Sequence, residues 1–209
     1  MQINAREFDQ RARTVFKPIY PAIADQILDY TGIRQGVCLD IGCGGGYLGL
    51  ALAHKSELNL RFLDQSPEML EIVRENLMEQ GLEGRGETIL ADVESIPLPD
   101  ACADLAISRG SIFFWEDHVA AFREIHRVLT PGGMSYLGGG FGSTRLREEI
   151  GRQLEQEEQG ADKWRNLVKR NMSPEMLQKF EDALHLAQVP YDLVRNPEVG
   201  LWIVIRKAL

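Results

Sequence analysis

Residues 37–49 read Val-Cys-Leu-Asp-Ile-Gly-Cys-Gly-Gly-Gly-Tyr-Leu-Gly, and the rest of the chain is organised around this stretch. A short apolar run ends at Asp40 and Ile41, a glycine-rich turn covers residues 42–46, and a pattern typical of a helix follows. This order predicts a strand, a tight turn and a helix. Glycine suits such a turn because the backbone visits positive φ and because a Cβ would block an approaching ligand. The unpaired N–H groups at the start of the helix carry partial positive charge, so we expect a ligand there.

The glycines of this turn fit two ligand-binding motifs. Gly44, Gly46 and Gly49 fit the dinucleotide-binding pattern G-x-G-x-x-G. In a second frame, Asp40 and the glycines at 42, 44 and 46 fit an acidic-x-G-x-G-x-G pattern, which resembles motif I of the class I S-adenosylmethionine (SAM) methyltransferases. A third interpretation is a turn that only lets a helix pack on a strand. The turn alone leaves all three open.

Length and composition indicate an ordinary soluble globular protein. The 209 residues allow one α/β domain with additions, or at most two small domains. The apolar fraction of 44% and the charged fraction of 26% exclude a disordered or fibrous chain. The net charge of −8 argues against non-specific nucleic-acid binding. No run approaches the roughly 20 apolar residues of a membrane helix, so we expect no membrane association.

The cysteines indicate a reducing compartment. Cys38, Cys43 and Cys102 form no C-x-x-C pair and no disulfide framework. Residues 1–7 contain no apolar signal core. We therefore expect a cytoplasmic protein. The sequence predicts no metal site and does not predict the oligomeric state.

Predicted strands and helices alternate along most of the chain. Apolar runs predict strands at about 36–41, 58–63, 88–91, 101–108 and 134–137, and a helix at 117–129. Ser66 is a predicted N-cap before Pro67, and Leu-Thr-Pro-Gly-Gly at 129–133 predicts a turn before the fifth strand. Runs at 191–195 and 201–205 predict an antiparallel hairpin at the sheet edge. The pattern predicts an α/β fold with a doubly wound, Rossmann-like, seven-stranded sheet, mostly parallel with an antiparallel C-terminal hairpin strand.

Two segments lie outside this alternation, within what we expect to be a single domain over residues 1–209. Residues 1–31 have apolar positions at helical spacing, interrupted by Pro18 and Pro21. They are predicted to form either a helical lid that contributes Arg13, Phe16 or Tyr20 to a pocket, or a helix that covers a sheet edge. Residues 143–172 are charged and are predicted to form a helical insertion near the substrate side.

Aspartates stand at or near the ends of the first three predicted strands, at Asp40, Asp64 and Asp92. Ligands of open α/β sheets bind beyond the carboxyl ends of the strands, where the strand order reverses. Asp64 follows Asp40 by 24 residues, and a carboxylate at this position can accept both ribose hydroxyls of a bound nucleotide. That role fits NAD as well as SAM.

The segment around Asp92 distinguishes the two ligands. Residues 91–100 read Ala-Asp-Val-Glu-Ser-Ile-Pro-Leu-Pro-Asp and resemble the segment after strand three of class I methyltransferases. Asp-Gln-Ser-Pro-Glu-Met-Leu at 64–70 and the turn at 129–133 are similar to two further motifs of that family. The resemblance spans about residues 36–140 by motif, and the tail by topology, because the family has a reversed seventh strand. The chain is identified as a class I SAM-dependent methyltransferase, similar to the type 11 small-molecule group.

The resemblance implies SAM as cofactor and S-adenosylhomocysteine as product. The glycine turn approaches the methionine part, Asp64 holds the ribose, and the residue after it borders the adenine. Asp92 reads the adenine edge together with the next residue, Ser108 faces the sulfonium, and Asp40 orients the turn. The residues implied to bind the cofactor are Asp40, Gly42, Cys43, Gly44, Gly46, Asp64, Gln65, Asp92, Val93 and Ser108.

The acceptor is less well defined. Residues 108–117 read Ser-Arg-Gly-Ser-Ile-Phe-Phe-Trp-Glu-Asp and lack the Asn/Asp-Pro-Pro-Tyr/Phe signature of many nucleic-acid and amide N-methyltransferases. We expect a small-molecule acceptor between the N-terminal segment, this loop and the glycines at 138–142. No catalytic residue is identified, and His118 and His126 are interpreted as solvated or capping side chains. The residues expected to contact the acceptor are Tyr20, Arg109, Trp115 and Phe141.

Several alternatives stay open. Arg109 could pair with an anionic acceptor, with the SAM carboxylate or with a structural carboxylate, and Trp115 could stack on substrate or fill the core. An NAD-dependent oxidoreductase would explain three glycines and Asp64, but not Asp92 or the terminal hairpin. A non-catalytic SAM-binding or assembly subunit would explain a cofactor pocket without an acceptor signature.

Overall fold

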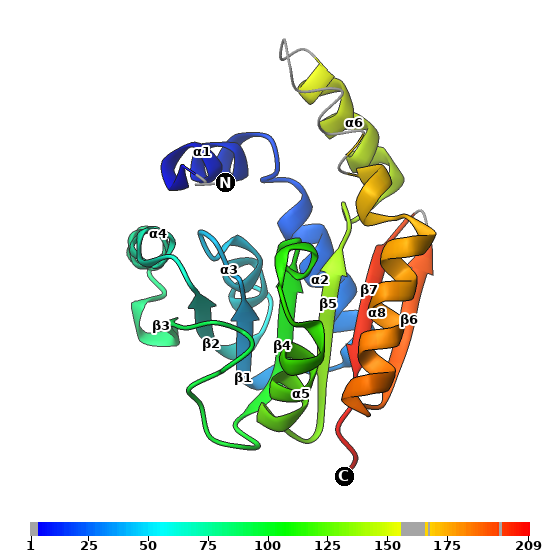
Figure 1. Ribbon diagram of the computed structural model, residues 1–209. Coiled ribbons are helices and arrows are strands. Elements are labelled where there is room, and N and C mark those ends of the chain that lie inside the picture. The colour runs from blue at the N-terminus through cyan, green and yellow to red at the C-terminus, as the bar shows by residue number, and fades with distance from the viewer. Residues whose placement is uncertain (1–3, 156–165, 167, 197) are drawn as a thin grey trace.

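The computed structural model describes residues 4–155, 166, 168–196 and 198–209, and it contains one seven-stranded sheet (Figure 1). The strand order is β3-β2-β1-β4-β5-β7-β6. The first five strands pair in parallel, whereas β7 pairs antiparallel with both β5 and β6. The predicted doubly wound sheet with an antiparallel C-terminal hairpin is therefore confirmed. The strands are β1 (Gln35–Ile41), β2 (Glu57–Asp64), β3 (Gly86–Leu90), β4 (Ala103–Arg109), β5 (Leu129–Gly139), β6 (Tyr191–Asn196) and β7 (Gly200–Ile205).

Helices cover both faces of the sheet. One apolar cluster joins the sheet to α2, α3, α4 and α6, and a second joins it to α5 and α8. The chain order reverses between β1 and β4, so a ligand crevice is expected at the carboxyl ends of these two strands. The helices are α1 (Ala5–Thr14), α2 (Ile19–Thr31), α3 (Tyr47–Ala53), α4 (Pro67–Glu79), α5 (His118–Val128), α6 (Thr144–Glu155) and α8 (Pro174–Ala187), with 3-10 turns η1 (Glu83–Arg85) and η2 (Ser111–Phe114).

Local sequence explains where the helices begin. The Ser66 hydroxyl accepts a hydrogen bond from the Met69 N–H at 3.2 Å, and Pro67 follows at the first helical position of α4, so the predicted N-cap is confirmed. Such a cap stabilises a helix by about 1 kcal/mol. In α2, Pro21 lies within the first turn, where the N–H groups have no intrahelical acceptor. The N-terminal helical pattern is therefore broken once, before Ile19, and Pro21 does not interrupt it.

Strand β5 starts earlier than the sequence predicts. The expected turn at 129–133 lies within the strand as an irregularity, because the register with β4 shifts from Ala103↔Leu129 to Leu105↔Met134. The Gly132 N–H donates to the Lys207 carbonyl at 2.9 Å, and the Lys207 N–H donates to the Gly133 carbonyl at 3.1 Å. These two bonds pair the irregular residues Gly132 and Gly133 with Lys207, which is distant from them in the sequence.

Helices α1 and α6 lie beyond the carboxyl ends of the parallel strands, whereas α2, the rest of the predicted N-terminal addition, packs on a face of the sheet (Figure 1). Helix α1 sits above α3 and α4, whereas α6 rises beside β7 and packs Leu146, Ile150 and Leu154 into the first apolar cluster. Residues 156–165 and 167 of the predicted insertion 143–172 lie outside the described residues. Among the described residues no helix combines the length and the apolar character needed to cross a bilayer.

Candidate cofactor site

The glycine turn follows β1 at the edge where the strand order reverses. Gly42, Gly44 and Gly46 have φ angles of 60°, 53° and 78°, in the left-handed region that other residues avoid. A Cβ on Gly42 would collide with the side chain of Ser111, and one on Gly44 would lie 3.0 Å from the ring of Phe8. Glycine is required here by both conformation and space.

Asp40 ties the turn to the helix that follows it. Its side chain is only 2% exposed, and Oδ2 accepts a hydrogen bond from the Gly49 N–H at 3.0 Å. Burial raises the pKa of Asp40 to about 7, the nearby charge of Asp64 adds to this rise, and the bond from Gly49 opposes it. Asp40 therefore fixes β1 against α3.

Asp64, the last residue of β2, ties the turn to the neighbouring strand. One carboxylate oxygen accepts from the Gly44 N–H at 2.9 Å, and the other accepts from the Ser66 N–H at 3.0 Å. The Cys43 N–H donates to the Leu63 carbonyl at 3.1 Å. Since each carboxylate oxygen can accept more than one hydrogen bond, Asp64 keeps acceptor capacity for the hydroxyls of a ligand.

The ends of β2 and β3 form one continuous edge. The Ala91 N–H donates to the Asp64 carbonyl at 3.1 Å, which holds the segment of Asp92 beside Asp64. The exposed Asp92 carboxylate accepts from the Glu94 N–H at 2.9 Å, whereas Val93 is buried. Leu90 is 60% exposed at this edge, and it offers apolar surface that a flat ring can cover.

A hydroxyl cluster lies on the other side of the turn. The Ser108 and Ser111 hydroxyls are 2.6 Å apart, and the Ser111 hydroxyl donates to the Ile41 carbonyl at 3.0 Å. The Trp115 indole N–H donates to the same hydroxyl of Ser111 at 3.3 Å. Ser108 is fully buried, and the hydroxyl that lies against Gly42 is that of Ser111.

Arg109 ends β4 next to this cluster. Its guanidinium carbon lies 5.5 Å from the centre of the Phe16 ring, 5.7 Å from that of Tyr20 and 5.8 Å from that of Phe141. Its Nε–H donates to the Gly140 carbonyl at 3.3 Å. Burial lowers the pKa of Arg109, yet a guanidinium stays charged near neutral pH.

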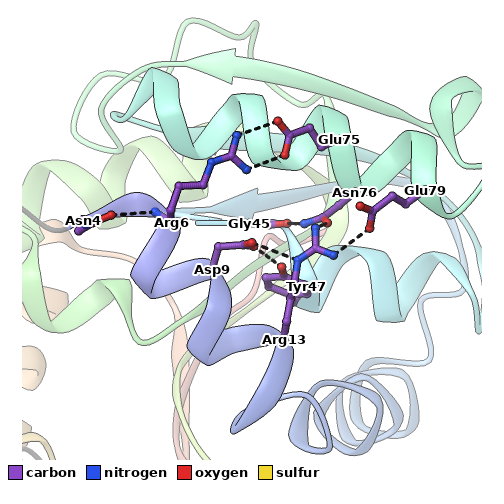
Figure 2. Close-up of polar contacts among 9 residues, drawn as sticks. All are labelled: Asn4, Arg6, Asp9, Arg13, Gly45, Tyr47, Glu75, Asn76 and Glu79. Atoms are coloured by element: carbon purple, nitrogen blue, oxygen red, sulfur yellow. Dashed lines mark hydrogen bonds and ion pairs between the residues drawn. The ribbon is translucent and has the colours of Figure 1, made fainter.

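Helix α1 is held above the turn by polar contacts (Figure 2). Arg6 makes two hydrogen bonds to Glu75 of α4, at 2.7 and 2.8 Å. Arg13 pairs with Glu79 at 2.9 Å and with Asp9 at 3.0 Å, and Asp9 also accepts a hydrogen bond from the Tyr47 hydroxyl. These polar contacts of α1, here called the α1 clamp, are therefore largely electrostatic.

Asn76 of α4 joins this clamp to the turn. Its side-chain oxygen accepts a hydrogen bond from Arg13, and its side-chain nitrogen donates to the Gly45 carbonyl at 2.8 Å. Asn76 is 1% exposed, so both contacts are shielded from water. Figure 2 shows the two bonds leaving the same amide in opposite directions.

Comparison with known proteins identifies the family. The methyltransferase-domain family matches residues 39–137. A crystal structure from Methanococcus maripaludis, assigned as an S-adenosyl-L-methionine-dependent methyltransferase, superposes with a TM-score of 0.93 and 39% sequence identity, covering 100% of this chain and 98% of that one. The chain belongs to the SAM-dependent methyltransferases.

Curated relatives match about half of the methyltransferase chain. A 2-methyl-6-phytyl-1,4-hydroquinone methyltransferase from Oryza sativa is 36% identical over 48% of this chain, and a malonyl-[acyl-carrier protein] O-methyltransferase from Serratia marcescens is 33% identical over 46%. The matches span 30% and 35% of these relatives' own lengths. The family assignment rests on the structure from Methanococcus maripaludis, whereas these partial relatives name two different acceptors.

The methyltransferase site brings most of the predicted cofactor residues to one edge of the sheet. Gly42, Gly44 and Gly46 form the turn, Asp64 bonds to it, and the segment of Asp92 lies alongside. The exposed Gln65 follows Asp64 at the same edge. The turn presents main chain without side chains, and Asp64 keeps acceptor capacity, so the residues present fit SAM.

The predicted acceptor residues are brought together only in part. Tyr20, Arg109 and Phe141 lie in one group, whereas Trp115 packs against His118 and Phe122 of α5, with ring centres 6.0 and 6.2 Å apart. Trp115 reaches the site only through its bond to the Ser111 hydroxyl.

One histidine was misinterpreted from the sequence. His118 is neither solvated nor a cap, since it is 4% exposed and its Nε2 lies 2.8 Å from the Ile112 carbonyl. Burial lowers the pKa of His118, so the ring is neutral near pH 7. Its contacts place it in the packing beneath η2.

Three residues of the site carried no signal in the sequence. Ser111 lies in a loop of no assigned motif, and its role depends on the approach of Gly42 from another strand. Leu90 is one apolar strand residue among many, and Asn76 is a polar residue within a helix. Only the tertiary fold brings Ser111 and Asn76 to the turn and Leu90 beside Asp64.

Proposed function

We propose that this protein transfers the methyl group of SAM to a small-molecule acceptor. The observation that carries the proposal is the glycine turn, whose main chain is tied by Gly44 to Asp64 and lies against Ser111 on its other side. Membership of the SAM-dependent methyltransferase family supports the same activity. When bound, SAM supplies an electrophilic methyl group on a sulfonium.

The residues proposed to hold the cofactor each act on one part of it. The main chain at 42–46 receives the methionine part, and Asp64 accepts hydrogen bonds from the ribose hydroxyls. Asp92 and the backbone of Val93 read the adenine edge, while Leu90 covers one face of the ring. For the sulfonium side we propose Ser111 together with the predicted Ser108, because the Ser111 hydroxyl would meet a Cβ on Gly42 and lies 2.6 Å from the Ser108 hydroxyl.

Catalysis is proposed to depend on alignment. Orientation of a nucleophile against a reactive carbon lowers the barrier substantially, and a general base is needed only when the acceptor must lose a proton. His118 is engaged with the Ile112 carbonyl inside the fold, so we assign it no proton transfer. The acceptor is therefore expected to present an atom that is nucleophilic at neutral pH.

The acceptor is proposed to be a small molecule on two grounds. The net charge of −8 does not favour a large polyanion, and aromatic side chains surround the end of β4, as is usual in small-ligand sites. A cytoplasmic location is proposed because Cys38, Cys43 and Cys102 are all free. Fractionation of cells that express the tagged chain tests that location.

Two measurements test the proposed function. In calorimetric titrations, SAM and S-adenosylhomocysteine are expected to bind, and NAD is not. Incubation with methyl-labelled SAM and a metabolite extract is expected to label a small product. Tight NAD binding without SAM binding would favour an oxidoreductase, and SAM binding without any labelled product would favour the non-catalytic subunit.

A further inference from the structure

Arg109 is a half-buried arginine that makes one hydrogen bond and, among the described residues, has no carboxylate at ion-pair distance. Arg6, Arg13 and Arg127 each pair with Glu or Asp at 2.7 to 3.0 Å. Arg85 represents a purely structural use, since it donates three hydrogen bonds to main-chain carbonyls. Arg109 makes one hydrogen bond, to the Gly140 carbonyl, and otherwise faces rings.

Most of the guanidinium N–H groups have no hydrogen-bond partner among the described residues, and they are not fully buried. A guanidinium has five N–H donors in a fixed plane, and the single bond to Gly140 uses one of them. Three ring contacts attract a cation but supply no hydrogen-bond acceptor in the plane of the guanidinium, and a partly buried cation is stabilised when an anion pairs with it. The remaining donors form the fork that carboxylates and phosphates match bidentately.

Arg109 also lies where an acceptor must approach. It stands between Ser108 and the short segment that brings Ser111 against the glycine turn. On its other side, the Tyr20 ring stacks on Tyr47, the first residue after the turn, with ring centres 5.3 Å apart. The cation is thus within the neighbourhood of the turn, and α2 and the loop after β5 supply apolar walls.

We infer that Arg109 is a specificity-determining residue that binds an anionic group of the acceptor, a carboxylate or a phosphate on an otherwise apolar molecule. The rings of Phe16, Tyr20 and Phe141 cover the apolar part next to the anion. The inference rests on the proposed function and narrows it to acidic acceptors. No carboxylate of the described residues pairs with this cation, and we propose that the ligand completes the pairing.

The test uses the full chain loaded with S-adenosylhomocysteine and the NMR signal of the Arg109 Nε–H, assigned by its loss in Arg109→Gln. Four small probes share a phenyl ring and differ in charge: phenylacetate, phenyl phosphate, phenylacetamide and benzylamine. Saturable shifts with phenylacetate or phenyl phosphate are expected at concentrations about tenfold below any effect of the amide. The stronger of the two acids then identifies the anion. Equal responses to acid and amide, no saturable response to any probe, or saturation by benzylamine would each overturn the inference.

Variants separate this role from its rivals. Arg109→Lys keeps the positive charge but loses the planar pair of N–H donors. It is therefore expected to bind phenylacetate more weakly than the wild type and more tightly than Arg109→Gln. Arg123→Gln is the matched control, because the exposed Arg123 guanidinium donates to the Leu186 carbonyl and has no carboxylate partner among the described residues, and this variant should leave probe binding unchanged.

Cofactor affinity provides the last readout. SAM binding to Arg109→Gln should stay within about threefold of wild type, whereas a loss greater than about tenfold would assign Arg109 to the SAM carboxylate and overturn the inference. Absence of SAM binding in the wild type would instead defeat the proposed function. The two failures are therefore distinguishable.

Discussion

At the scale of single residues, Asp64 has a double task. It holds the turn through the Gly44 N–H and is proposed to hold the cofactor ribose. Asp64→Ala is expected to weaken SAM binding by more than about tenfold, because charge-assisted hydrogen bonds contribute about 1.5–3 kcal/mol each. Calorimetry measures the affinity and thermal unfolding checks the fold. Asp29→Ala, at a surface ion pair, is the control, and an unchanged affinity in Asp64→Ala would show that the carboxylate is structural.

Gly42 allows a sharper comparison, because the chain contains a second glycine with a similar backbone. Gly42 and Gly32 have φ of 60° and 70°, but a Cβ would meet Ser111 only at Gly42 and open space at Gly32. Each substitution by Ala carries a conformational cost of about 1 kcal/mol. Gly42→Ala is expected to lose more stability in denaturant titrations and also to lose SAM binding. Equal losses of stability in Gly42→Ala and Gly32→Ala would contradict this account. So would a Gly42→Ala, Ser111→Gly double variant that is no more stable than Gly42→Ala.

Asp40 predicts how stability depends on pH. Burial raises the pKa of Asp40 to about 7, above the value of about 3.9 in an unfolded chain. The folded state therefore binds more protons between these values, and the contribution of Asp40 to stability is fully present below about pH 4 and lost as pH rises to about 7. The wild type should lose up to about 4 kcal/mol relative to Asp40→Asn over this range. Parallel stability curves for the two proteins would refute the prediction.

At the scale of elements, α1 is attached by charges and not by a core. Only Asp9 and Ala12 of this helix are buried, and Arg13 bonds to Asp9, Asn76 and Glu79. Arg13→Ala should increase amide exchange in residues 5–14 while leaving α4 unchanged, and added salt should act in the same direction. Hydrogen-exchange mass spectrometry measures both. Arg34→Ala, which breaks an exposed pair with Asp29, should leave α1 protected.

The elements could be predicted from sequence where their signals are local. Apolar runs located the strands to within a few residues, and the Ser66 and Pro67 pair marked the start of α4. The start of β5 was wrong because its stabilising partner, Lys207, lies at the other end of the chain. The Asp64 position followed from motif spacing, but the approach of Ser111 to Gly42 depends on two strands meeting. Long-range contacts of this kind leave no local pattern.

At the scale of the whole molecule, the C-terminal hairpin completes the core. Trp202 of β7 is fully buried, its ring centre lies 4.7 Å from that of Tyr136, and its indole N–H donates to the Val199 carbonyl at 2.6 Å. Trp202→Ala should lower the free energy of unfolding by about 4 kcal/mol. Leu186→Ala, at a side chain that is 65% exposed, should cost below about 0.5 kcal/mol. Chemical denaturation of both variants measures these losses. Similar denaturation midpoints for the two variants would show that Trp202 and β7 contribute little to the core.

The proposed cofactor and acceptor contacts are distributed very differently along the chain. Most of the proposed cofactor contacts lie between residues 40 and 93, within the family match at 39–137. The aromatic residues around Arg109 are Phe16, Tyr20 and Phe141, which lie outside that match. Divergence toward a new acceptor can therefore proceed at these outlying positions while the inherited cofactor half stays intact. Proteins with this division can therefore evolve a new acceptor specificity while the residues that bind the methyl donor stay the same.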